Sequence, residues 1–209
     1  MFGKFFNSKF FELLSKFVDV LIIGLYFLLC SIPIITIGAS LTSLYYAINK
    51  SIYQGRGYTT EFFHSFKQNF KQCTLTWLIY IVLFGFCGLD IYLTRQMAAE
   101  GKYQTLGIIF LVLFVALVML AIYHFAYIAR FSNKVLASFK FSLILLILHF
   151  PTTLIMLVIL AGFALVCYMI PPVVLVAPAL YAVCIRPLLE KVFRKYMTEE
   201  DLEHESSYN

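Results

Sequence analysis

An apolar run of 31 residues, 17–47, constrains this chain more than any other stretch. Its only charged residue is Asp19, and Pro33 lies near its middle. As one helix the run would measure about 46 Å, against about 30 Å for the hydrocarbon core of a bilayer. Pro33 removes a helix hydrogen bond and disfavours helical geometry in the residue before it. The run therefore crosses a membrane once, bent, or goes out and returns as a hairpin.

The composition places the folded chain in lipid. Hydrophobic residues make up 62% of the 209 residues and charged residues only 13%, whereas an average soluble domain has about 25% charged residues. A soluble fold could not cover so much apolar surface. We expect an all-α, polytopic membrane protein with one helical membrane domain over residues 1–195. Residues 196–209 hold five acids and no Lys or Arg, which predicts a flexible acidic tail.

The distribution of Lys and Arg decides between one crossing and a hairpin. Cytoplasmic loops of membrane proteins carry the excess of positive charge. Only two of the 16 basic residues, Arg95 and Lys102, lie between 93 and 104. The other 14 lie in four segments, 4–16, 50–71, 130–140 and 186–195. A single crossing would put the four charges of 50–71 outside, whereas a hairpin keeps all four rich segments inside. The charges therefore predict a hairpin that turns near Pro33, with both termini cytoplasmic.

The hairpin interpretation gives about six membrane segments, arranged as three hairpins. They are residues 17–32, 34–49, 73–93, 105–129, 149–170 and 172–188. The second is short enough to be re-entrant or interfacial.

Amphipathic helices are expected beside these segments. Apolar residues at helical spacing over 1–17, with lysines between them, predict a helix that lies in the membrane interface. In 60–71, Phe62, Phe66 and Phe70 form a second apolar stripe, with Thr60 as the expected N-cap.

Small and polar residues around Pro33 are the leading candidates for helix packing, because association in lipid depends on close packing and hydrogen bonds. They are Thr36, Gly38, Ala39, Ser40 and Ser43. This face could meet a partner protein or the chain's own last hairpin, and we slightly favour the partner. The Phe62, Phe66 and Phe70 stripe is a second candidate contact. Gly85 and Gly88 are expected to pack within the chain. Asp90 is the membrane-edge charge to test.

The sequence contains none of the common catalytic or ligand-binding motifs. It has no Gly-x-x-x-x-Gly-Lys-Ser/Thr, no His-Glu-x-x-His and no Gly-x-Ser-x-Gly. Its five cysteines form no Cys-x-x-Cys, and its four histidines are scattered. We therefore expect no catalytic residue, no metal, no cofactor and no nucleic-acid partner.

Several short motifs resemble those of the YesL-like family, a bacterial group of integral membrane proteins long carried as a domain of unknown function. They are Pro33-Ile34-Ile35-Thr36-Ile37-Gly38-Ala39, Leu44-Tyr45-Tyr46, Phe62-Phe63, Phe66-Lys67-Gln68-Asn69-Phe70-Lys71-Gln72 and Trp77-Leu78. The resemblance covers nearly the whole chain. It implies an association with carbohydrate utilisation, since members tend to be encoded beside sugar ABC importers, glycan-degrading enzymes and sensor kinases. It supplies no catalytic residue.

This resemblance leads us to expect a non-enzymatic accessory or assembly subunit of a carbohydrate ABC importer in the bacterial cell membrane. Its partners would be the lipid bilayer and the permease subunits. The Glu-Ala-Ala coupling loop of importer permeases does not occur in the sequence, so the chain would be an added subunit. Two alternatives stay open: a small stand-alone solute transporter or facilitator, and a membrane partner of a sensor kinase controlling carbohydrate utilisation.

Overall fold

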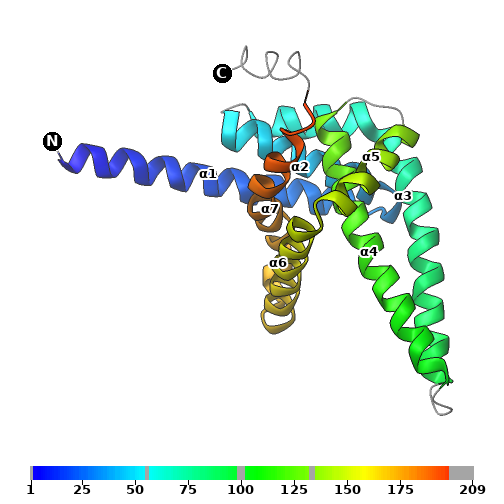
Figure 1. Ribbon diagram of the computed structural model, residues 1–209. Coiled ribbons are helices and arrows are strands. Elements are labelled where there is room, and N and C mark those ends of the chain that lie inside the picture. Colours follow the sequence, from blue (N-terminus) through cyan, green and yellow to red (C-terminus); the bar gives the residue numbers. More distant parts are fainter. Residues whose placement is uncertain (1, 55–56, 98–101, 132–134, 198–209) are drawn as a thin grey trace.

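The computed structural model describes residues 2–54, 57–97, 102–131 and 135–197, so most of the predicted acidic tail lies outside the described residues. Within these ranges the chain is helical and contains no strand (Figure 1). The elements are α1 (Phe2–Ser31), η1 (Ile34–Thr36), α2 (Ile37–Gln54), α3 (Tyr58–Gln96), α4 (Lys102–Arg130), α5 (Val135–Leu148), α6 (Phe150–Met169), η3 (Pro171–Leu175) and α7 (Ala177–Phe193).

The predicted fold class, a polytopic helical membrane protein, is confirmed. By length and composition, four of the described helices are long and apolar enough to cross a membrane. These segments are Phe10–Ser31, Tyr58–Gln96, Thr105–Arg130 and Phe150–Met169. The second and sixth predicted segments correspond to α2 and α7, and neither is among these four candidate spans.

The first apolar run folds as a hairpin, as Pro33 indicates. α1 ends at Ser31, and a turn of 3-10 helix leads into α2. The turn satisfies its own polar groups, because the backbone N–H and the hydroxyl of Thr36 both donate to the Pro33 carbonyl, at 2.9 and 2.7 Å. The predicted interfacial helix over 1–17 is continuous with the segment that follows it, and both belong to α1.

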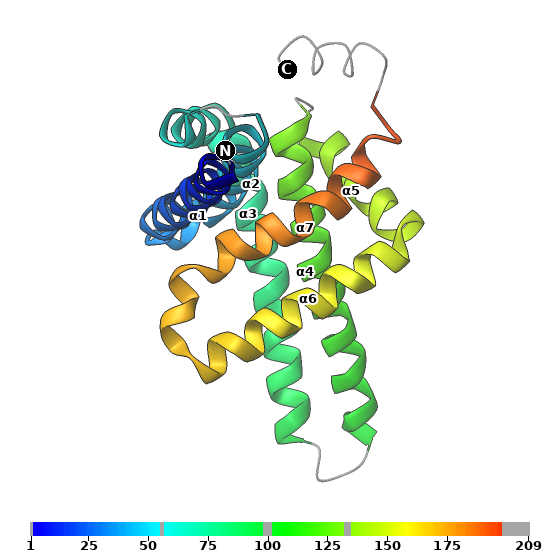
Figure 2. The same ribbon diagram turned by 90° about the vertical axis from the view of Figure 1, so that its left-hand side faces the viewer.

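α1, α2 and the first part of α3 lie in one layer, named here the crosswise layer. In Figure 1 these helices run across the molecule, whereas the later part of α3 and all of α4 descend from it. Figure 2 shows the three members of the layer nearly end-on. The predicted amphipathic segment 60–71 and the predicted crossing 73–93 are thus one continuous helix that changes direction. It begins at Tyr58 with Gly57 at the N-cap, so the predicted Thr60 cap is wrong.

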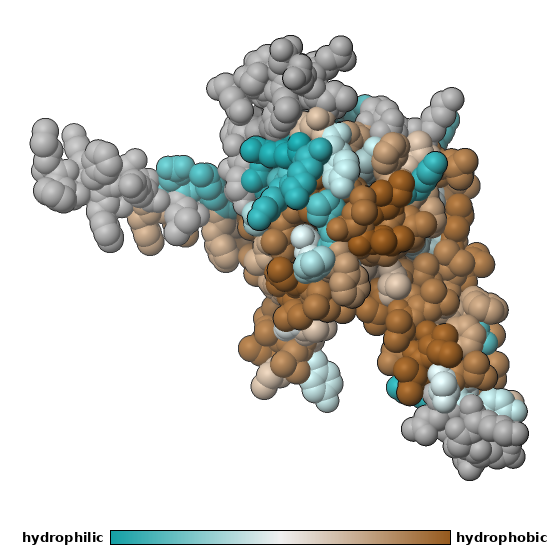
Figure 3. Space-filling model, in the orientation of Figure 1, coloured by the Kyte–Doolittle hydropathy of each residue, from teal (hydrophilic) through white to brown (hydrophobic). Residues whose placement is uncertain are grey.

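Two helical hairpins extend from the crosswise layer. The later part of α3 pairs with α4, and α6 pairs with α7 through η3, where Pro171 and Pro172 turn the chain at the boundary of the fifth and sixth predicted segments. The two hairpins are inclined to each other (Figure 2). Their visible surfaces are strongly apolar, whereas hydrophilic residues gather at the opposite end of the molecule (Figure 3).

Three apolar clusters form the core. One joins the layer to α7 through Ile23, Ile48 and Ala179. Another joins α2 and α3 to α4, around Ala39, Cys73 and Tyr80. The last joins α4 to α6 and α7, with members such as Tyr123, Met156 and Leu189. The layer is therefore packed against both hairpins.

Candidate functional site

A buried ionic cluster lies where α2, α4 and α7 meet. Arg130 is the last residue of α4, and its Nη2 lies 3.4 Å from Oε2 of Glu190 on α7. The two side chains are only 9% and 6% exposed. Tyr45, on α2, donates its hydroxyl to Oε1 of Glu190 at 3.3 Å. One carboxylate thus connects three helices.

A second polar contact extends the cluster by one helical turn. Arg186 precedes Glu190 by four residues on α7, and Asn49 follows Tyr45 by four residues on α2. The Nε of Arg186 donates to Oδ1 of Asn49 at 2.9 Å. Since residues four apart share a helix face, α2 and α7 face each other in antiparallel register through two polar pairs.

The environment of the cluster keeps the phenol of Tyr45 protonated. Burial, and then the charge of the Glu190 carboxylate, raise the pKa of Tyr45 well above its ordinary value. A protonated phenol can donate to the carboxylate and offset part of the cost of burying it. Breaking a buried ion pair by removing one partner is strongly destabilising. The arrangement therefore serves to hold the C-terminal part of α7 against α2 and α4.

Sequence reasoning missed the central residue of this cluster. The charge distribution places Arg130 and Arg186 only among the basic residues of the segments expected to be cytoplasmic. Glu190 was not singled out, although it is the only acid between Glu100 and Glu199. A lone acid in so long an apolar and basic stretch is a usable signal, because an unpaired carboxylate there would be costly.

A second buried polar pair lies between α3 and α4. The side chains of Tyr80 and His124 are fully buried, with ring centroids 5.9 Å apart, and Phe125 and Phe139 flank both rings. The Tyr80 hydroxyl and both His124 ring nitrogens have no hydrogen-bond partner among the described residues. No group of three or more His, Cys, Asp or Glu in the described part of the chain could hold a metal ion.

The predicted small-residue face is occupied inside the chain. A Cβ added to Gly38 would lie 2.7 Å from the Cys73 carbonyl oxygen and 2.9 Å from Cε1 of Phe125. Ser40 and Ser43 are fully buried, and their hydroxyls donate to carbonyls of Thr36 and Ala39. The slight preference for a partner protein on this face is therefore not supported, because α3 and α4 cover it.

The alternative prediction is that the small-residue face after Pro33 packs against the chain's own last hairpin. In the structure the part of α2 that packs there is a later one, around residues 44–48. Ala179 and Ala182 of α7 belong to the cluster that contains Leu44, Ala47 and Ile48 of α2. Gly38 contacts α3 and α4 instead. The two ends of α2 thus pack against different hairpins.

Gly85 and Gly88 differ from the expectation of internal packing. Both are exposed on α3, and a Cβ added to either would meet nothing within 4 Å. Gly162 on α6 is open in the same way. Among the glycines whose surroundings the structure describes, the three that meet nothing within 4 Å therefore lie on the two hairpins and not in the segment after Pro33.

The phenylalanine stripe of α3 is partly buried in the core. Phe62 is fully buried, Phe66 is half-buried and Phe70 is 37% exposed. The rings of Phe62 and Phe66 are stacked, with centroids 6.3 Å apart, and those of Phe66 and Phe70 are tilted to each other, with centroids 5.4 Å apart. Of the three, Phe70 presents the most surface to an outside contact. Pro33 is also exposed.

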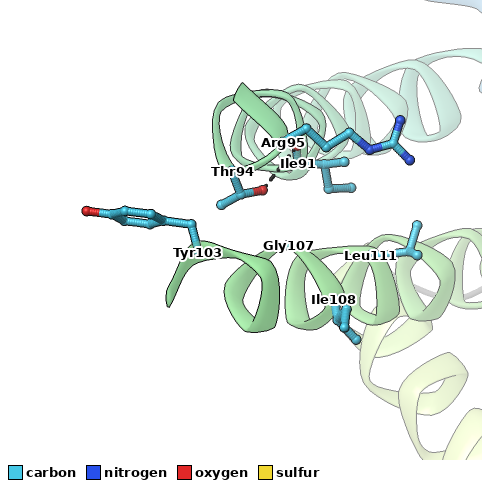
Figure 4. Close-up of a pocket in the computed structure, with 7 residues that line it drawn as sticks. All are labelled: Ile91, Thr94, Arg95, Tyr103, Gly107, Ile108 and Leu111. Carbon is cyan, nitrogen blue, oxygen red and sulfur yellow. Dashed lines mark hydrogen bonds between the residues drawn. The ribbon is translucent and has the colours of Figure 1, made fainter. Parts of the chain in front are cut away.

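Asp90 lies near the far end of the α3–α4 hairpin and is half-buried. Its Oδ2 is buried without a hydrogen-bond partner among the described residues. One turn further on is a shallow pocket lined by Ile91, Thr94, Arg95, Tyr103, Gly107, Ile108 and Leu111. Figure 4 shows Thr94 directed toward α4 near Gly107, while the side chains of Arg95 and Tyr103 point away. The pocket is thus mainly a helix contact.

Comparison with known proteins finds a match to a family model in the first part of this chain. A family model described as a protein of unknown function, DUF624, matches residues 20–91. The YesL-like family is a DUF624 family, so the resemblance expected from the motifs is confirmed. No curated protein and no solved structure matches the chain.

The DUF624 range contains most of the crosswise layer and the descending part of α3. It includes Tyr45 and Asn49 of the ionic cluster, whereas Arg130, Arg186 and Glu190 lie beyond it. The family description states no activity. Function must therefore be argued from the geometry of the site.

Proposed function

We propose that this chain is a non-enzymatic accessory or assembly subunit of a carbohydrate ABC importer in the bacterial cell membrane. The resemblance to the YesL-like family supports the carbohydrate importer as the partner system. The structural observation that carries the proposal is the open face of α3 at Gly85 and Gly88, where a Cβ added to either glycine would meet nothing within 4 Å among the described residues. Small residues let transmembrane helices approach closely. A permease helix is the occupant that we assign to this face.

The polar groups of the chain favour this proposal over a stand-alone facilitator. Transport pathways need polar groups that line a water-accessible route. Here the Thr42 hydroxyl lies 3.2 Å from Sγ of Cys73, and Ser142 donates to the Ser138 carbonyl at 2.7 Å. The buried charges of Arg130 and Glu190 face each other. The Thr42–Cys73 contact and the Arg130–Glu190 pair join different helices, and the Ser142 bond stays within α5, so each of these groups has a structural partner inside the fold.

The test is co-purification with a permease pair. The tagged chain is co-expressed with the permease subunits of a carbohydrate ABC importer, extracted in mild detergent and purified. We expect both permeases in the eluate. Gly85→Leu with Gly88→Leu should leave the abundance of the chain in the membrane unchanged, because a Cβ at either position would meet nothing within 4 Å among the described residues, and should remove the permeases. Gly162→Leu is the matched control on α6 and should retain them.

Three results would redirect the proposal. A fully active importer in a deletion strain, together with no co-purified permease, would overturn it. Solute uptake by proteoliposomes that contain only this chain would favour a facilitator. Loss of the response to inducer while the importer stays active would favour a partner of a sensor kinase.

A further inference from the structure

The orientation of α1 conflicts with its hydropathy. Its segment Phe10–Ser31 is long and apolar enough to cross a membrane. In the structure, however, α1 runs crosswise to α4, whose apolar segment Thr105–Arg130 has the higher mean hydropathy, 3.1 against 2.1. A bilayer that is crossed by α4 is therefore not crossed by α1 in the same structure.

One face of α1 carries an exposed apolar stripe from Phe10 to Leu29. Its large exposed side chains include Phe10, Leu14, Phe17, Leu25 and Leu29. These positions follow helical spacing, so they lie on one side of the helix. A helix that lies in a membrane interface has this pattern, because only one side meets the acyl chains.

The opposite side of α1 does not face lipid. In its first half it carries Glu12 and Lys16, which form an exposed ion pair at 2.9 Å. In its second half it packs into the core through Ile23 and Phe27. Figure 3 shows hydrophilic residues on the edge of α1 that faces away from the hairpins and hydrophobic residues on the edge that faces them. The apolar stripe is thus on the side where the hydrocarbon surrounds the hairpins.

We propose that α1 does not cross the membrane and that, with α2 and the first part of α3, it lies along the cytoplasmic face of the bilayer. The partner of the stripe is the lipid of the inner leaflet, at the boundary between headgroups and acyl chains. The layer stands at the end of α4 that carries Arg130, on the side of the four segments rich in Lys and Arg. The first two of the six predicted membrane segments therefore do not span, while the predicted sidedness of both termini is kept.

The depth of spin labels along α1 tests this inference directly. In a chain whose five native cysteines are replaced, single cysteines at Leu14 and Leu29 are labelled with nitroxide. The protein is reconstituted in vesicles of phosphatidylcholine and phosphatidylglycerol, and depth is measured from collisions with oxygen and with a water-soluble nickel complex. A helix along the surface places the two labels within about one turn, about 5 Å, in depth. A crossing helix separates them by about 22 Å.

Exposed positions on α4 give the matched control. Leu106 and Leu113 are two turns apart and both exposed, so a crossing α4 separates their labels in depth by about 10 Å. A depth gradient per residue along α1 as steep as that along α4 would overturn the inference.

A second measurement addresses the turn after α1. Ile32 is 74% exposed and Met97, at the far end of α3, is 53% exposed. In intact cells an impermeant thiol reagent should label a cysteine at Met97 and not one at Ile32. Labelling of Ile32 from outside would mean that α1 crosses. Neither measurement depends on permease binding, so failure here is distinguishable from failure of the proposed function.

Discussion

Gly38→Ala should destabilise the fold because the backbones of α2 and α3 meet at this glycine. An added Cβ would lie 2.7 Å from both the Cys73 carbonyl oxygen and the Trp77 Cβ, where ordinary contacts measure 3.4–4 Å. The first of these is a backbone atom and the second is attached directly to the backbone. No rotation of a side chain therefore relieves the overlap. The two helices must move apart.

The magnitude follows from the cost of overpacking. Extra methyl groups in a packed core typically cost about 1–3 kcal/mol. For a chain of this size that corresponds to a fall in melting temperature of roughly 2–12 °C. The separation also disturbs the hydrogen bond in which Nε1 of Trp77 donates to the Ile34 carbonyl at 2.7 Å.

Tryptophan fluorescence is a suitable assay, because Trp77 is the only tryptophan in the chain and lies at this contact. Thermal unfolding of the purified protein in detergent would be followed by its emission. Gly107→Ala is a graded control, since its Cβ would lie 2.9 Å from the side-chain hydroxyl of Thr94 and would meet no backbone atom of another segment. Gly85→Ala is the open control, and its helix propensity favours a gain of up to about 1 kcal/mol.

The expected order of melting temperatures is Gly85→Ala at or above wild type, then Gly107→Ala, then Gly38→Ala. If Gly38→Ala melted with wild type while the two controls kept their order, the close approach of α2 and α3 would be refuted.

The remaining predictions concern polar contacts, measured by circular dichroism melts in the same detergent. Glu190→Met should cost about 3–5 kcal/mol, because it leaves the Arg130 charge buried, and adding Arg130→Met should restore part of the loss. A double variant less stable than Glu190→Met alone would contradict the buried ion pair. Thr36→Val should cost about 1–3 kcal/mol by removing the hydroxyl bonds that close the turn after Pro33. Trp77→Phe should cost about 1 kcal/mol, the typical net worth of one lost hydrogen bond, and an unchanged melt would exclude its bond to Ile34.

Local chemistry explains what could be predicted from the sequence. Pro33 and the pair Pro171-Pro172 mark helix ends because proline acts on its own turn and on the residue before it. The structure ends α1 at Ser31 and α6 at Met169, close to these positions. The all-helical membrane class follows from composition, which requires no knowledge of contacts.

Packing partners could not be predicted in the same way. Gly38 and Gly85 are the same residue type in similarly apolar helices, yet one is enclosed by Cys73, Trp77 and Phe125 and the other meets nothing. The difference comes from the direction change in α3, which brings its middle against α2. That geometry depends on contacts between segments far apart in the chain, and helical spacing alone carries no information about them.

The positions of Lys and Arg could indicate on which side of the membrane a segment lies, but not whether the helices between such segments cross the bilayer. A hairpin that crosses twice and a hairpin that lies along one surface both return the chain to the side where it started, so the count of Lys and Arg is the same for both. The structure separates them through the crosswise direction of α1 and through the contacts that hold it. Tyr45 belongs to the layer, whereas Arg130 and Glu190 belong to the descending helices. Glu190 therefore lies where the crosswise layer meets the two hairpins. Its contacts with Tyr45 and Arg130 are a physical reason for the orientation of the layer.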